Sequence, residues 1–300
     1  MNEITILIPT YNRPKLLEQL LKELFKQTYR NFFIYVSVNK SEESKNREYL
    51  KISKKRKYKN IIFFFQKKKI HPGENFNFLK NKCKTKYFMW LADDDRLSYS
   101  TIEILYNSIN KNKGLVTIMP NWLHITGTNF KIMKKPVEYN SRIFFFRLIK
   151  FLFIGDDCSI YGLHKTNKLK KHNFEQKKYF FFNRNVSWNL AYLQVIQIMS
   201  EGKISLVKNN NAIWINDDFS QIKYHSESNK ERFFMKNFKL LILKINFYYF
   251  VLIRIKNLKK YFELFFLIFF LPFIIVYKFY YYLNFLFGAY LKKMLNRVQW

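Results

Sequence analysis

Three adjacent carboxylates give the sequence its strongest chemical signal. Asp93, Asp94 and Asp95 follow Tyr87 to Ala92, an apolar run that we interpret as a buried strand. Carboxylates this close repel one another unless a cation or solvent neutralises them. A D-x-D spacing puts two of them on one side of an extended turn, and such oxygen ligands suit Mg²⁺ or Mn²⁺, which also bind diphosphate oxygens. The triplet predicts either a divalent-metal site or a solvated turn whose Asp side chains cap a helix.

A second polar segment follows the apolar run 4–9, which we also interpret as a strand. Residues 10–14 (TYNRP) have turn chemistry, and their proline suits the first position of a helix. Backbone amides at a helix start attract phosphate. No glycine-rich loop is present, so the segment does not match a Rossmann or Walker fingerprint.

The elements that must position these residues alternate between strand and helix through the first 95 residues. Strands are predicted at 4–9, 32–38, 61–65, 87–92, 115–120 and 204–207. Helices are predicted from 14 to about 27, from 45 to about 57, over 100–111 and over 187–199. Residues 73–77 are predicted as a loop that leads into a short helix. The pattern predicts an α/β fold with a mostly parallel sheet, whose ligands bind at the carboxyl ends of the strands.

The composition excludes several classes of protein. The chain has 300 residues, 49% of them apolar, with 53 Lys and Arg against 21 Asp and Glu, a net charge of +32. Such hydrophobicity excludes a disordered chain, and seven Gly exclude a collagen. The two cysteines, Cys83 and Cys158, have no CxxC partner, which favours a reducing compartment over a disulfide frame. We find no signal-peptide pattern and expect the bulk of the chain in the cytosol.

The charge has two interpretations: a polyanionic partner, or the compositional drift of an AT-rich genome. The basic runs 54–57 and 67–69 lack interleaved aromatic platforms, so we predict solvated faces and no nucleic acid partner. The composition changes near residue 235, and 264–291 is long and apolar enough for a membrane span. Basic residues flank it on both sides, which also suits a helix lying on an anionic membrane surface. We predict membrane contact, leaving spanning or surface binding open; the alternative is a buried core helix.

Taken together, the opening TILIPTYNRPKLLEQLLKELFKQTY, the pair Asn39 and Ser41, the segment 73–77 (GENFN) and WLADDD resemble family 2 glycosyltransferases of the GT-A (Rossmann-like) fold. Bacterial surface-polysaccharide and lipopolysaccharide enzymes of the abequosyltransferase-like kind are the most similar. The resemblance is good over about 3–120, looser to about 225 and absent from the apolar C-terminal segment. It implies sugar transfer from a nucleotide sugar to a cytosolic, often lipid-linked, acceptor.

The resemblance assigns roles residue by residue. It implies a nucleotide-sugar pocket lined by Pro9, Thr10, Tyr11, Arg13, Asn39, Ser41, Asn75, Asn77 and Asp94. Asp93 and Asp95 match the metal-binding D-x-D, with Mn²⁺ or Mg²⁺ neutralising the departing diphosphate. The family's usual Asp before Asn39 is Val38 here, a departure in the base-reading loop. His225 is a candidate third metal ligand, although a lone His is more often structural.

The acceptor side departs further from the family pattern. Residues 155–163 (GDDCSIYGL) resemble the family's acceptor-side strand, with a plain loop-to-strand junction as the alternative. Inverting members need a general base, usually a carboxylate at the start of the next helix. That helix starts near 185–188 here without one, so we predict Asp157, ahead of Asp156, as the base. The alternatives are another carboxylate, or a reduced or retaining activity.

These expectations define one predicted enzyme with two parts. Residues 1–232 form the GT-A domain, with a nucleotide-sugar half at about 1–120 and an acceptor half at about 121–232. Residues 233–300 form a membrane-associating helical tail at the cytoplasmic side of the inner (plasma) membrane. The partners are a nucleotide-sugar donor, a saccharide or lipid-linked saccharide acceptor and an anionic membrane surface. The alternatives are a catalytically inactive GT-A fold, or a basic protein that binds membrane or nucleic acid.

Overall fold

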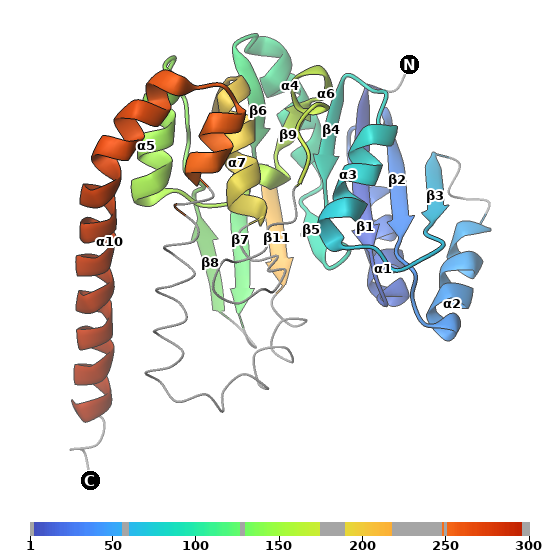
Figure 1. Cartoon of the computed structure of the whole chain (residues 1–300). Helices are drawn as coiled ribbons and strands as arrows, with labels where there is room; N and C mark the ends of the chain where they lie inside the picture. The colour runs from blue at the N-terminus through green and yellow to red at the C-terminus, as the bar shows by residue number, and fades with distance from the viewer. Residues whose placement is uncertain are drawn as a thin grey trace.

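The computed structural model describes residues 3–55, 60–126, 130–174, 190–217, 248 and 251–295. Here the chain forms two β-sheets, with helices on both faces of the larger one and a long C-terminal helix along one edge of the molecule (Figure 1). The predicted α/β fold, with a mostly parallel sheet, flanking helices and an apolar C-terminal helix, is confirmed.

The larger sheet is parallel except for β9, which runs antiparallel to both of its neighbours. Its seven strands lie in the order β10 (Lys203–Leu206), β6 (Leu115–Met119), β9 (Leu163–Lys165), β4 (Tyr87–Trp90), β1 (Ile4–Thr10), β2 (Phe32–Val38) and β3 (Ile61–Phe65). Because β1, β2, β3 and β4 are parallel, the residues that follow them meet at one edge of the sheet.

Side chains of β1 alternate between the two faces of this sheet. Ile4, Ile6 and Ile8 belong to one buried cluster, whereas Leu7 belongs to the other. Helices covering the first face are α1 (Pro14–Leu24), α2 (Glu43–Ser53) and α4 (Thr101–Lys111). Helices covering the second face are α3 (Pro72–Lys82), α5 (Phe144–Ile154) and α7 (Leu190–Glu201).

A smaller sheet lies at the carboxyl ends of these strands and was not predicted from the sequence. Its strands lie in the order β5 (Asp95–Leu97), β11 (Ile213–Asp217), β7 (Asn121–Thr126) and β8 (Phe130–Lys134). β5 starts at the third aspartate of the acidic triplet and pairs antiparallel with β11. Pairing in the small sheet therefore holds the backbone of Asp95, the last residue of the triplet.

Two predicted segments have a different local structure. The loop predicted over 73–77 is wrong, because α3 already starts at Pro72. The His71 side chain accepts a hydrogen bond from the Gly73 amide, and the Glu74 side chain accepts one from the His71 amide, which completes a capping box. Residues 155–163 contain a 3₁₀ turn, Cys158–Tyr161, and end at the first residue of the short β9; their role on the acceptor side stays a prediction.

The C-terminal helix α10 (Tyr261–Leu295) contains Pro272 and packs beside α5 (Figure 1). Residues 251–257, which are also helical, precede it, and Val251 and Ile255 belong to the buried cluster on the second face of the sheet. Among the described helices, none combines the length and the apolar character that crossing a membrane requires.

Candidate active site

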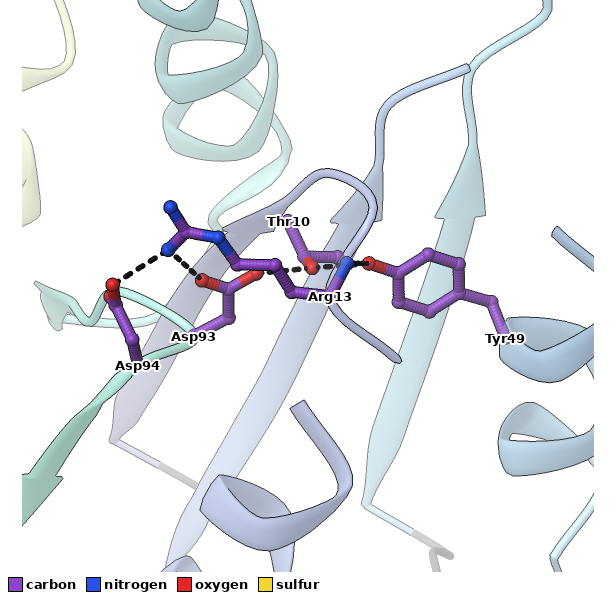
Figure 2. A network of polar contacts seen from close by, with 5 residues as sticks. All are labelled: Thr10, Arg13, Tyr49, Asp93 and Asp94. Carbon is purple, nitrogen blue, oxygen red and sulfur yellow. Dashed lines mark hydrogen bonds and ion pairs between the residues drawn. The ribbon is translucent and has the colours of Figure 1, made fainter. Parts of the chain in front are cut away.

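The ends of β1 and β4 bring four predicted site residues into one network (Figure 2). The Thr10 hydroxyl donates to Asp93 Oδ2 at 2.5 Å. Arg13 Nη1 lies 2.6 Å from Asp94 Oδ2 and 3.3 Å from Asp93 Oδ1, so one guanidinium bridges two carboxylates. Thr10 Oγ1 also lies 2.8 Å from the Tyr49 hydroxyl, which accepts from the Arg13 amide at 2.8 Å.

Strand register explains why these residues meet. Leu7 pairs with Trp90 in the parallel β1–β4 ladder, and Thr10 and Asp93 each lie three residues further along. The chain then reverses through Asn12, whose φ of 57° is in the left-handed region that asparagine tolerates better than most residues. The Asn12 amide donates to Ser41 Oγ at 3.2 Å, which fixes this turn against the loop after β2.

In this network, burial and the neighbouring charges shift the pKa values of Asp93 and Arg13 in opposite directions. Burial raises the pKa of Asp93 to about 6, although the Thr10 hydroxyl and the Arg13 charge act to lower it. Burial also disfavours the charged guanidinium, but the Asp93 and Asp94 carboxylates outweigh it and raise the pKa of Arg13. Burial raises the pKa of Tyr49 to about 12, so this hydroxyl stays protonated at neutral pH. The Asp93 carboxylate therefore needs a cation beside it to stay ionised at low energy.

A small cavity of about 220 Å³ opens beside the triplet. Its walls are Asp93, Asp94, Asp95 and Arg96 on one side and Leu16, Gln19, Leu20 and Glu23 of α1 on the other. Carboxylate oxygens are the donors that Mg²⁺ and Mn²⁺ prefer, so the chemistry of the triplet fits the predicted metal. No group of three or more His, Cys, Asp or Glu within the described residues forms a complete metal site.

The predicted asparagines lie near this edge but bind the protein's own backbone. The Asn39 amide group bonds to both backbone groups of Ile70, its Nδ2 donating at 2.8 Å and its Oδ1 accepting at 2.9 Å. Asn75 bonds to the side chain and the carbonyl of Ser37. Asn77 bonds to the carbonyl and the amide of Phe174 at 2.8 and 2.7 Å. In this structure these three side chains join the loops around the site.

The remaining predicted pocket residues differ in exposure. Pro9 lies in β1 opposite Ser37 of β2, while the exposed Tyr11 ring has Lys69 Nζ 4.8 Å from its centre. Ser41 is buried, and its hydroxyl donates to the Asn39 carbonyl at 2.9 Å. His225, the candidate third ligand, lies outside the described residues.

The two candidate bases have different surroundings. Asp156 is buried and accepts hydrogen bonds from the amides of Val137 at 3.0 Å and Cys158 at 3.1 Å, so it holds the turn together. Asp157 is partly exposed at the start of the 3₁₀ turn. Its carboxylate is close enough to the Tyr161 hydroxyl to contribute to that group's raised pKa.

Tyr161 connects the two acidic regions, and the sequence analysis did not identify it. Burial is the largest cause of its raised pKa, followed by the charges of Asp95, Asp157 and Asp94. Its ring packs on Trp214 of the small sheet with centroids 4.6 Å apart. Tyr49 has no motif around it, and Tyr161 lies in the 155–163 segment but was given no role there, so the folded structure is what shows both beside the acidic residues.

Comparison with known proteins agrees with this arrangement. The sequence profile of glycosyl transferase family 2 matches residues 5–169, more than half of the chain. The chain belongs to glycosyl transferase family 2. No curated protein matches this chain, and the abequosyltransferase-like subtype is not confirmed. The matched range includes the Thr10–Arg13–Asp93 network and Asp157, so both acidic regions lie within the family domain.

Solved structures with the same fold include TarS of S. aureus. The TarS 1–349 structure has a TM-score of 0.56 at 14% identity, and covers 72% of this chain and 60% of that one. Its complex with UDP-GlcNAc has a TM-score of 0.55 at 16% identity, covering 72% and 58%. The longer TarS structure has a TM-score of 0.55 at 14% identity, covering 72% and 36%. The chain thus spans less than two thirds of these proteins, and the likeness shows the fold.

Proposed function

We propose that this family 2 protein transfers a sugar from a nucleoside-diphosphate sugar to a saccharide acceptor. The observation that carries the proposal is the Arg13 bridge between Asp93 and Asp94 at the carboxyl ends of β1 and β4. A bound diphosphate and a cation could both exchange into such a bridge, because guanidinium pairs with phosphate and carboxylates pair with metal. The TarS complex with UDP-GlcNAc supports the donor class, since that protein shares the fold.

The triplet would hold the divalent metal, with Asp93 and Asp95 as ligands and Asp94 beside the donor ribose or sugar. Bound there, Mn²⁺ or Mg²⁺ would neutralise the charge that develops on the leaving diphosphate. Arg13 would then turn from Asp93 toward the diphosphate, where its charge has the same effect. Thr10 would keep the Asp93 carboxylate oriented through its hydroxyl, as it does in this structure.

We propose a reaction in which the first acidic region acts on the donor and the second on the acceptor. An acceptor hydroxyl oxygen attacks C1 of the donor sugar, and the bond from C1 to the diphosphate oxygen breaks with its electron pair. Asp157 takes the hydroxyl proton, and the anomeric configuration inverts. The electrostatic proximity of Asp157 to Tyr161, which also responds to Asp94 and Asp95, supports placing the acceptor between the two regions.

We further propose a lipid-linked saccharide as acceptor, of the lipopolysaccharide or capsule type, at the cytoplasmic side of the plasma membrane. The apolar helix α10 supports this class, because it gives the transferase domain a surface that suits a lipid environment. The predicted division at 232/233 separates these two roles: the catalytic domain binds the sugars, and the C-terminal segment keeps it near the acceptor.

A thermal-shift screen tests the donor site. Nucleoside diphosphates and nucleotide sugars are added to the full chain with and without Mn²⁺, since a ligand that binds the folded state raises the melting temperature. We expect a metal-dependent shift with one nucleotide, lost in Asp93→Asn and kept in Glu43→Gln, whose carboxylate is exposed. No shift with any nucleotide in folded protein would favour an inactive fold or a purely binding protein.

A further inference from the structure

The two sides of α10 have opposite environments. Leu267 and Ile274 are buried against the body of the protein. The opposite side exposes Phe265 by 70% and Phe269 by 67%. Exposed apolar side chains of α10 are Tyr261, Phe262, Phe265, Ile268, Phe269, Phe270, Phe273, Val276, Tyr277 and Tyr280. A side that remains this apolar after the other is buried needs a further partner.

Helix α5 extends the same surface. Phe145 of α5 packs on Phe266 with ring centroids 5.6 Å apart, and Phe153 packs on Tyr277 at 5.2 Å. The exposed apolar side chains here are Phe146 and Ile154 of α5 and Ile143, which directly precedes the helix. Thirteen of the eighteen large apolar side chains that are exposed in the described part of the chain lie on or next to these two helices. We name these thirteen side chains the aromatic face.

Basic side chains border the aromatic face. Arg142 and Lys150 are exposed at α5, and Lys256 and Lys259 are exposed just before α10. Lys260 Nζ lies 5.9 Å from the centre of the Phe144 ring, so its stem follows the apolar surface. Glu263 is the one acidic residue in the sequence of α10. Aromatic side chains with a cationic border are the composition that binds anionic lipid surfaces.

The charge of the chain indicates whether a membrane or a second copy of the chain covers the aromatic face. Each copy carries +32, and pairing two aromatic faces would bring two basic borders together. Like charges repel in such an interface, whereas an anionic bilayer would neutralise them. We propose that the aromatic face binds the surface of an anionic bilayer, with α5 and α10 lying at the headgroup boundary. This inference rests on the membrane localisation in the proposed function and names the surface that makes the contact, but it does not depend on sugar transfer.

The proposal has a consequence for the acceptor side. Helix α5 ends at Ile154, directly before the turn that carries Asp156 and Asp157. In Figure 1, α10 continues past α5 and reaches below the large sheet, on the side toward which β1 and β2 point. Docking through these helices therefore places the turn that carries Asp156 and Asp157 on the side of the molecule near the lipid surface.

Co-sedimentation of the full chain with vesicles tests the proposal. One set of vesicles contains phosphatidylcholine alone, and the other contains about one third phosphatidylglycerol. The double variant Phe265→Ser/Phe269→Ser should bind the anionic vesicles at least about tenfold more weakly, since each phenyl ring that leaves water for lipid strengthens binding. Tyr99→Ser is the matched control, because Tyr99 is exposed by 54% and lies outside the aromatic face.

A second variant tests the charge. Lys150→Gln/Lys256→Gln should weaken binding to the anionic vesicles by about fivefold for each charge removed, and should leave binding to neutral vesicles unchanged. Nucleotide-dependent melting shifts of all variants, measured without vesicles, should match the wild type, which separates docking from the donor site. Equal binding of wild type and Phe variant to both vesicles would overturn the proposal. The proposal would also be overturned if the wild type did not bind vesicles but formed a dimer in solution that the Phe variant did not form.

Discussion

The two acidic regions of the protein hold their carboxylates in different ways. Asp93 is held by side chains, the Thr10 hydroxyl and the Arg13 guanidinium. Asp156 is held by backbone amides of Val137 and Cys158. A side-chain partner can rotate away when a ligand arrives, whereas a backbone amide can leave only if the chain itself moves. The comparison therefore supports the ligand-binding role that we propose for Asp93 and indicates a structural role for Asp156.

The largest effect should come from the triplet. In our proposal Asp93 and Asp95 hold the metal that would neutralise the leaving diphosphate, so we expect Asp93→Asn and Asp95→Asn each to lower transfer activity about a thousandfold or more. The measurement is nucleotide release with donor and acceptor present. Glu43→Gln should keep full activity, and an active Asp93→Asn variant would remove the basis for the proposed site.

The next effect should come from Asp157, which shares the acceptor side with Asp156. We expect Asp157→Asn to lower kcat about a hundredfold or more without changing stability, because a general base contributes about 10²–10⁴ to the rate. Steady-state kinetics and urea unfolding of the same protein separate the two quantities. If Asp157→Asn lowered the free energy of unfolding and left kcat unchanged, Asp157 would have a structural role like that of Asp156.

Asp156 should show the reverse behaviour. Asp156→Ala leaves the amides of Val137 and Cys158 without their acceptor, and we expect a loss of about 3 kcal/mol in the free energy of unfolding. Urea denaturation measures it. Donor affinity of the protein that remains folded should equal that of the wild type, and a lower affinity at full stability would contradict the assignment.

The sequence predicted the nucleotide half of the fold better than the acceptor half. β2 and β3 have the predicted ends, because each is a short apolar run flanked by polar residues. The family resemblance predicted Asp93, Thr10 and Arg13 in one site, and the neighbouring parallel strands β1 and β4 bring them together. Helix α5 was missed because nine of its eleven residues are apolar, which hides the helical spacing of its buried residues. In the small sheet, β11 pairs with β5 and β7 across long stretches of sequence, and no local pattern shows that pairing.

The predicted asparagines show another limit of sequence analysis. Asn75 and Asn77 were assigned to the nucleotide by their motif, and the structure shows their amides bonded to Ser37 and Phe174. An amide side chain binds a nucleotide or a backbone equally well, because it carries both donors and acceptors. Their role at the nucleotide stays a prediction.

A smaller effect is expected at Arg13, the movable partner in the comparison. Arg13→Gln removes a charge-assisted hydrogen bond to each of two carboxylates, and in our proposal also one to the diphosphate. We expect donor affinity to fall about tenfold, with Arg13→Lys recovering part of it. Titration calorimetry measures both, and unchanged affinity in Arg13→Gln would show that the guanidinium serves only the protein.

The smallest expected effect concerns Lys80, a buried cation that we compare with the two buried carboxylates. Lys80 is buried in α3 and donates to the carbonyl of His172, and burial lowers its pKa to about 8. The unfolded chain then binds more protons than the folded one between pH 8 and the ordinary lysine value of 10.5. Stability of the wild type should therefore rise with pH across this window, by at most about 1.4 kcal/mol per pH unit.

The variant Lys80→Met provides the reference for that slope. It has no ammonium group to titrate, so its unfolding free energy should show a smaller rise between pH 8 and 10 than the wild type does. Urea denaturation at several pH values gives both slopes. Equal slopes would mean that Lys80 keeps its ordinary pKa in the folded protein.

The account depends most on whether the bridged carboxylates at the ends of β1 and β4 bind the donor. Titration of a nucleoside diphosphate into wild type, Asp93→Asn and Asp156→Ala, with and without Mn²⁺, tests this directly. We predict metal-dependent binding in wild type and Asp156→Ala and none in Asp93→Asn. Binding that Asp93→Asn retains at full affinity, or that Asp156→Ala alone abolishes in folded protein, would contradict the account.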